Sequence, residues 1–353
     1  MRPKITGVVV ILFAVIAALS ALDRFLARVE SSELHGSAQR SFEAGSRLLQ
    51  TGKAGEAVDL LRQAHSGERE NPDYELELIS ALTESGKTAD AEPLMTEMLQ
   101  REPNDGRVNL IAARLRKQEG NPADAEAYYH RAIYGEWRMD PARHRIAARL
   151  ELVDDLMKRG RRQELLAELI SLGAEPEITP AVRKRLARLF LDTGSPARAA
   201  DEYRALIAKD PKDVTAAEGL GEAELEQGQY SAARAAYLQG FFQNPNDASI
   251  QMHLATLNTV VALDPTLRQL TSEEKYRRSV RILDMARTAL AGCAAQNPLL
   301  AQVTGQMPAH VTNEDAEKVL ALAEQIWRAG NDACGAAVNA EDALNLLMRK
   351  LAT

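Results

Sequence analysis

The fold is decided by two successive stretches that follow one pattern, LARLFLDTGSPARAADEYRALIAKDP at residues 186–211 and LGEAELEQGQYSAARAAYLQGFFQNP at residues 220–245. In each stretch a glycine is followed by alanine five positions later, tyrosine nine positions later and proline seventeen positions later. Proline cannot donate the helical hydrogen bond, so it ends a helix. The pattern therefore predicts two antiparallel helices joined at the glycine turn.

The same glycine recurs outward from these stretches, at positions 52, 86, 120, 160, 194 and 228, so that every interval but one has the same length. One helix pair cannot bury its apolar face alone, and stacked pairs bury it together. The spacing thus predicts an array of six helix pairs over 38–246. The longer interval, between positions 120 and 160, marks an insertion from Tyr134 to Pro141 between the third and fourth pairs.

These units resemble the tetratricopeptide repeat family. The positions that carry the resemblance are Leu186, Ala187, Phe190, Gly194, Ala199, Tyr203 and Pro211 in one unit, and Leu220, Gly221, Gly228, Tyr230, Ala233, Tyr237 and Pro245 in the next. The resemblance implies an all-α fold, a right-handed superhelix or α-solenoid, whose first helices line a groove for a protein partner. Residues 247–353 are helical but irregular, and are either degenerate repeats that cap the array or a small all-α domain.

The N-terminus has the character of a membrane segment. Arg2 and Lys4 precede an uncharged run from Ile5 to Leu22, whose length lies at the short end of the range for a spanning helix. We expect a transmembrane helix over 5–25, residues 1–4 in the cytoplasm by the positive-inside rule, and a linker over 26–37. The alternatives are a secretory signal cleaved near Ser20 and a buried soluble helix.

Composition excludes several classes. The net charge of −7 argues against nucleic-acid binding as the main task, and two cysteines exclude a disulfide-dense scaffold or a four-cysteine zinc site. No HExxH, GxSxG, GxGxxG or P-loop sequence is present among the 353 residues. We therefore expect no catalytic residues, no cofactor and no metal, and an enzyme built on the irregular C-terminal block remains only a third hypothesis.

Counting from each turn glycine places a set of first-helix side chains in the groove that the family resemblance implies. The predicted groove residues are Arg107, Leu110, Arg114, Asp154, Lys184, Arg188, Glu218 and Glu222. Their mixed charge predicts a peptide or protein partner of mixed charge, and the alternative for each residue is an ordinary solvated surface charge. The family's carboxylate clamp needs asparagines that this sequence lacks at those positions, so that specificity is not carried over.

Two further pairs of residues stand out. Tyr134 and Trp137 in the insertion either contact a partner, as exposed aromatics often do, or fill a gap between repeats. Cys293 and Cys334 in the C-terminal block form a disulfide in an oxidising compartment, or remain two separate thiols.

The leading functional hypothesis is a single-pass protein of the inner membrane that displays a repeat array on the extracytoplasmic side, periplasmic in a Gram-negative bacterium. It would serve as an interaction scaffold, an accessory or assembly subunit of a membrane protein complex. The alternative is a cleaved, soluble periplasmic chaperone or adaptor.

Overall fold

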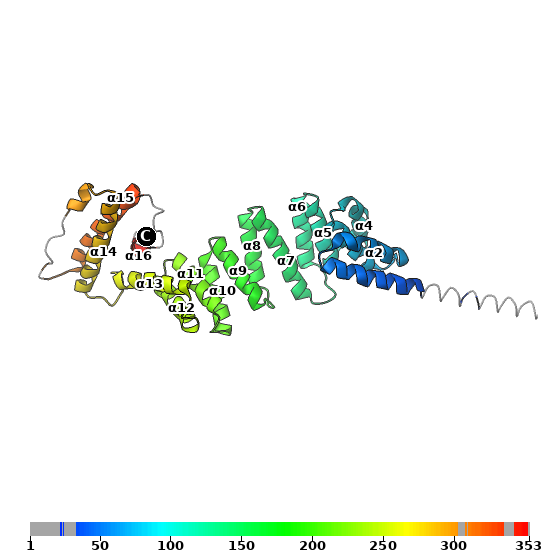
Figure 1. The fold of residues 1–353 in the computed structure, drawn as a ribbon, viewed down its shortest axis with the longest axis horizontal. Helices are drawn as coiled ribbons and strands as arrows, with labels where there is room; N and C mark the ends of the chain where they lie inside the picture. Colours follow the sequence, from blue (N-terminus) through cyan, green and yellow to red (C-terminus); the bar gives the residue numbers. More distant parts are fainter. Residues whose placement is uncertain are drawn as a thin grey trace, which may run out of the picture. The chain divides into compact units, whose positions relative to one another are not determined.

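The computed structural model describes residues 22, 24, 33–302, 308, 310–334 and 342–351. Every regular element in these residues is a helix, and the one β-bridge among them joins Asp105 to Glu136. The predicted all-α repeat fold is therefore confirmed for the described part of the chain (Figure 1).

The helices come in successive pairs, a first and a second helix for each repeat. A helix described over 33–50 precedes its second helix α2 (Ala54–Gly67). The following pairs are α3 (Pro72–Glu84) with α4 (Thr88–Arg101), α5 (Gly106–Gln118) with α6 (Pro122–Tyr134), α7 (Pro141–Lys158) with α8 (Arg162–Gly173), α9 (Pro180–Asp192) with α10 (Pro196–Lys209), and α11 (Val214–Glu226) with α12 (Tyr230–Gln243).

The six turn glycines join the two helices of each pair through a left-handed backbone. Their φ angles are 75° at Gly52, 77° at Gly86 and Gly120, 68° at Gly160, 69° at Gly194 and 70° at Gly228. Side chains with a Cβ atom adopt this region at a cost, whereas glycine enters it freely. The turns predicted from the glycine spacing are thus confirmed.

Small residues let neighbouring helices approach closely, as the pattern predicts. In the sixth repeat a Cβ atom at Gly219 would overlap the Tyr203 ring, and one at Gly221 would come within 2.6 Å of the Tyr237 ring. Both tyrosine rings are buried against glycine backbone. The bulky position nine residues after the turn therefore packs on the glycine-containing first helix.

The chain divides into two compact units, the first ending at Glu168 and the second beginning at Leu169. Each unit has its own core. In the first unit Leu61, Ile79, Met95 and Leu115 are fully buried between successive helices. The sequence did not predict a division of the repeats at this point.

The C-terminal block consists of α13 (Ala248–Leu263), α14 (Ser272–Cys293), a short 3₁₀ turn, α15 (Asn313–Cys334) and α16 (Ala343–Leu351). α14 and α15 are long and pack along one another (Figure 1). The predicted cap of α14 is present, since the Thr271 hydroxyl accepts a hydrogen bond from the Glu274 backbone at 3.2 Å. The buried residues of α12 and α13 form one core with those of α14, α15 and α16. The C-terminal block thus shares its core with the last helix of the regular repeats.

The predicted membrane anchor over 5–25 lies outside the described residues except for Leu22 and Arg24. None of the helices that the structure describes is both long and apolar enough to span a bilayer.

Candidate functional site

A cleft of about 270 Å³ opens in the first unit between the first helices of three successive repeats. One wall comes from Phe42 on the helix over 33–50, the floor from α3, and the other wall from α5. The lining residues are Phe42, Asn71, Asp73, Tyr74, Leu76, Glu77, Arg107 and Ile111. Apolar and polar side chains thus line one concave site, the combination that ligand-binding clefts generally show.

The apolar part of the cleft is built on an aromatic stack. The rings of Phe42 and Tyr74 lie 4.5 Å apart between centroids at an interplanar angle of 24°. Tyr74 is buried, Phe42 is half-buried, and Leu76 and Ile111 complete the apolar lining. An apolar side chain of a partner would therefore find aromatic and aliphatic surface already in place.

Two carboxylates line this cleft, the exposed Asp73 and the half-buried Glu77. Burial raises the pKa of the Glu77 carboxyl, the Ser46 hydroxyl opposes that rise, and the charge of Glu84 adds to it. Arg107 on α5 lowers the pKa of Glu77 more weakly. A half-buried carboxylate of this kind gains from a further positive charge, so the cleft favours a basic group on its occupant.

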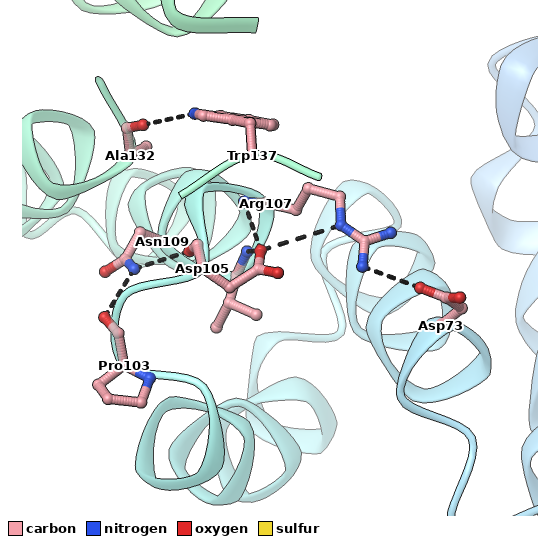
Figure 2. Close-up of polar contacts among 8 residues, drawn as sticks. Asp73, Pro103, Asp105, Arg107, Asn109, Ala132 and Trp137 are labelled. Carbon is pink, nitrogen blue, oxygen red and sulfur yellow. Dashed lines mark hydrogen bonds and ion pairs between the residues drawn. The ribbon is translucent and has the colours of Figure 1, made fainter. Parts of the chain in front are cut away.

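Arg107 is held in position by two carboxylates, as Figure 2 shows. Its Nη2 lies 2.9 Å from Asp73 Oδ1 on α3, and its Nε lies 3.9 Å from Asp105 Oδ1 at the start of its own helix. Asp73 and Arg107 occupy equivalent positions of consecutive repeats, since one repeat length separates them. The guanidinium thus ties the floor of the cleft to one wall.

The start of α5 is fixed by a compact network. Asp105 caps the helix, and its carboxylate accepts hydrogen bonds from the backbone of Arg107 at 2.8 Å and of Val108 at 3.2 Å. The buried Asn109 amide donates to the Pro103 carbonyl at 2.9 Å (Figure 2). These contacts orient the first turn of α5, from which Arg107 projects.

The insertion between the third and fourth repeats supports this turn. The Gly106 backbone donates to the Glu136 carbonyl, and the Glu136 backbone donates to the Asn104 carbonyl, both at 2.8 Å. The Trp137 indole donates to the Ala132 carbonyl at 2.9 Å and stacks on the His144 ring, with centroids 4.6 Å apart. The indole is thus packed between repeats, which is the second of the two roles considered for it.

Tyr134, the other insertion residue singled out, has 72% of its surface exposed. The Arg149 guanidinium lies over its ring at 5.7 Å from the centroid. Contact of Tyr134 with a partner remains a prediction.

The predicted groove residues fall into two groups. Several basic members pair with carboxylates on or at the start of a neighbouring first helix, the preceding one for Arg107 and the following one for the others. The pairs are Arg107 with Asp73, Arg114 with Glu151 at 2.5 Å, Lys184 with Asp213 at 2.7 Å, and Arg188 with Glu222 at 2.7 Å. These groups form a ladder of ion pairs between adjacent repeats within each unit, so their charges are partly neutralised before any partner arrives.

The other groove predictions have different settings. Leu110 is buried and is not among the residues that line the cleft. Asp154 and Glu218 are half-buried. Burial and the charge of Asp247 raise the pKa of Glu218, while His253 lowers it.

Sequence reasoning missed most of the cleft, although a signal for it was present. Counting from the turn glycine places Leu110 in the groove, and the same count in the two preceding repeats gives Leu76 and Phe42, each one repeat length earlier. Both line the cleft. Extending the count to every repeat would have located the site, whereas Glu77 and Tyr74 needed the structure.

A second, more open cleft of about 570 Å³ lies between α13 and α14 in the irregular block. Its ionisable lining groups are Arg281 and Asp284, beside Asn258, Thr259 and Met285. One acid and one guanidinium do not make a pair of acid and base with separated roles. No cluster of three or more metal-binding side chains occurs among the residues that the structure describes.

Cys293, at the end of α14, is disulfide-bonded. The sequence contains one other cysteine, Cys334, whose side chain lies outside the described part of the structure. The pairing of the two cysteines stays a prediction.

Comparison with known proteins identifies the repeats. Family models described as tetratricopeptide repeat match residues 184–255, 48–115 and 82–150. Proteins of this family are interaction scaffolds that typically lack enzymatic activity.

A curated relative is cellulose synthase 1 operon protein C of Komagataeibacter xylinus, 28% identical over 160 residues. The match covers 42% of the chain but only 12% of that much longer protein.

Similar solved structures include the C-terminal part of a repeat protein from Cytophaga hutchinsonii and the type IV pilus biogenesis factor PilW. The first is 10% identical with a TM-score of 0.44, and covers 83% of this chain and 98% of its own. PilW is 18% identical with a TM-score of 0.40, and covers 62% of this chain and 98% of its own.

Proposed function

Because this chain is a tetratricopeptide repeat protein, we propose that it is an interaction scaffold that receives a protein partner in the cleft between its first three first helices. The observation that carries the proposal is the combination of the Phe42–Tyr74 stack with the half-buried carboxylate of Glu77. An occupant with an apolar side chain next to a lysine or arginine matches both features.

Specificity in this cleft comes from its acidic side. Asp73 already pairs with Arg107 at 2.9 Å, so Glu77 is the carboxylate with more to gain from a cation of the partner. An acidic partner segment would meet Glu77 with a like charge in a partly apolar setting, which is unfavourable.

We propose further that the scaffold is anchored in the inner membrane by residues 5–25, with the repeats on the extracytoplasmic side, as an accessory or assembly subunit of a membrane complex. Tethering raises the effective concentration of the cleft near membrane partners, so a modest affinity suffices. The uncharged run from Ile5 to Leu22 and its leading basic residues support this arrangement.

Site-specific photocrosslinking tests the binding proposal. A benzoylphenylalanine at position 42, in the full chain in its native membranes, should give one discrete crosslinked protein. The same group at position 97, an exposed residue on the second helix α4, is the matched control and should give none. Glu77→Arg should abolish the adduct at position 42. Equal crosslinking at both positions, or an adduct unaffected by Glu77→Arg, would rule out the cleft.

The soluble alternative rests on the small residues Ala18 and Ser20, which suit signal cleavage. Sequencing the N-terminus of the mature protein decides between the two. A mature start near Ala21 would establish the cleaved adaptor and remove the anchor, while a retained Met1 or Arg2 supports the anchor. Protease added to spheroplasts should digest the repeats if they lie outside the cytoplasm, and should leave them intact if they lie inside.

A further inference from the structure

The last helix, α16, is short and depends on its surroundings. It has nine residues, fewer than an isolated helix needs to be stable in water. Leu344, Leu346, Leu347 and Met348 are all buried. The helix is therefore ordered by the surface on which it lies.

Three polar contacts attach α16 to three different parts of the second unit. The Tyr230 hydroxyl on α12 donates to the Leu346 carbonyl at 2.5 Å, and Lys350 Nζ lies 2.6 Å from Asp264 Oδ2 just after α13. The Trp327 indole on α15 donates to the Asn345 side chain at 2.6 Å. The contact from Tyr230 recognises backbone, so it does not depend on the side chain at position 346.

By repeat position, the surface beneath α16 corresponds to the predicted groove side of the last repeats. A small cleft of about 100 Å³ there is lined by Leu346 of α16 together with Leu225, Met252, His253, Thr256 and Leu257. Met252 lies one repeat length after Glu218, and Thr256 lies one repeat length after Glu222. Glu218 and Glu222 are predicted groove residues, so Met252 and Thr256 occupy the equivalent groove positions of the next repeat. α16 therefore lies where a ligand of the predicted groove is expected.

The fit of α16 to this surface is incomplete. The cleft beside Leu346 leaves unfilled space, and Met252 at its edge is 58% exposed. Asp264, the carboxylate that contacts α16, is only 3% exposed and is matched by a lysine of α16. The site thus selects a helix with an apolar face followed by a basic residue, and has room for a larger side chain than Leu346.

We infer that this face of α11 and α13 is a helix-binding site that α16 occupies in cis, and that an amphipathic partner helix with the same apolar face and a following lysine exchanges with it. The site lies in the second unit and is distinct from the cleft of the first unit. A negative result for one of the two proposals therefore leaves the other standing. In this arrangement α16 limits access to the site, and release of α16 opens it.

The test uses the full chain and a fluorescein-labelled peptide with the sequence of residues 342–353. Leu347→Asp combined with Met348→Asp places charges in the buried face and should release α16. The released chain should bind the peptide at least about tenfold more tightly than the native chain, because an occupied site lowers apparent affinity by its unoccupied fraction. Arg349→Gln, on the exposed face of the same helix, is the matched control and should bind as the native chain does.

Equal affinity of the native and released chains for the peptide would overturn the inference. Binding of a control peptide that carries the two aspartates would also overturn it, because binding would then not depend on the apolar face of the helix. Hydrogen exchange in the native chain provides an independent measurement if the double variant unfolds. The amides of α16 should exchange faster than those of α13, whereas equal protection would show that α16 leaves only on global unfolding and would refute the exchange.

Discussion

Trp137 lies directly over Gly106, so that a Cβ atom at position 106 would overlap the indole Cε2 atom. The contact joins the insertion to the first turn of α5, which carries Arg107 into the cleft. The insertion is therefore a structural support for the proposed binding site, acting through the backbone on which the site is built.

This contact predicts a specific steric effect. Gly106→Ala should lower the free energy of unfolding by about 1–3 kcal/mol, the usual cost of overpacking. In a Trp137→Ala background the same change should cost much less, because the indole is gone. Urea unfolding of the four proteins of this cycle measures the coupling, and additive effects would show that the contact is not responsible.

The raised pKa of Glu77 predicts a conflict between stability and binding. Its pKa lies above the ordinary 4.5, so the folded state binds this proton more tightly than the unfolded state does. The stability gained from protonation is present at low pH and is lost as the pH rises through the folded pKa. Glu77→Gln should therefore leave the stability at pH 7 unchanged or raised, by less than about 1 kcal/mol. It should weaken binding of a basic partner, while Glu97→Gln on α4 should change neither. A clear loss of stability in Glu77→Gln would contradict this account.

The ladder of ion pairs predicts a charge-reversal rescue. Arg188→Glu and Glu222→Arg should each lower the free energy of unfolding by up to about 1 kcal/mol, since both groups are well exposed. At low salt the double reversal should recover the part of that loss that comes from the Arg188–Glu222 pair, and this recovered part should shrink in 1 M salt. The contact of Arg188 with Asp192 on its own helix, at 3.2 Å, is not restored by the reversal. Thermal unfolding of the single and double variants checks the coupling, and absence of recovery would mean that the pair contributes nothing.

The contact between Lys350 and Asp264 predicts acid release of α16. Burial alone would raise the pKa of Asp264, but hydrogen bonds from Lys350 and Thr266 outweigh it and hold the pKa below the ordinary 3.8. This stabilisation is present above the unfolded pKa and is lost as the pH falls through the folded value. Trp327 fluorescence, in a Trp137→Phe background, should report the release in acid. Asp264→Asn should flatten that pH dependence, and an unchanged profile would exclude Asp264 as its source.

The predicted disulfide between Cys293 and Cys334 would close a long loop, from the end of α14 to the end of α15. Its removal by Cys334→Ser should lower the free energy of unfolding by about 3–4 kcal/mol on the chain-entropy estimate. Mass spectrometry of a non-reduced digest should recover one crosslinked peptide pair. Recovery of Cys293 in an intermolecular crosslink would instead indicate a covalent dimer.

The regular part of the fold was predictable from sequence because its cause is local. A glycine at each of six turns takes a left-handed φ, and no other common residue substitutes freely there, so the spacing of glycine alone marks the helix pairs. The bulky residues nine positions later, such as Tyr203 and Tyr237, follow from the space left by glycine on the first helix.

The candidate site was predictable only in part, because it depends on which charges find partners. Sequence position placed Arg114 and Arg188 toward a groove, but their pairing with Glu151 and Glu222 depends on the stacking of consecutive repeats. The docking of α16 is harder still to predict from sequence, because its contact with Tyr230 joins distant parts of the sequence and involves a backbone carbonyl. No local pattern encodes a contact of that kind.

The ion pairs between equivalent positions also constrain how such an array can grow. Arg107 pairs with Asp73, and Arg188 with Glu222, each across one repeat length, so the same position carries opposite signs in neighbouring repeats. A tandem duplication of either repeat would bring two like charges face to face at the new junction. Lengthening this protein by copying one repeat would therefore require a compensating substitution. The segment that can be duplicated without one is the pair of repeats with its junction.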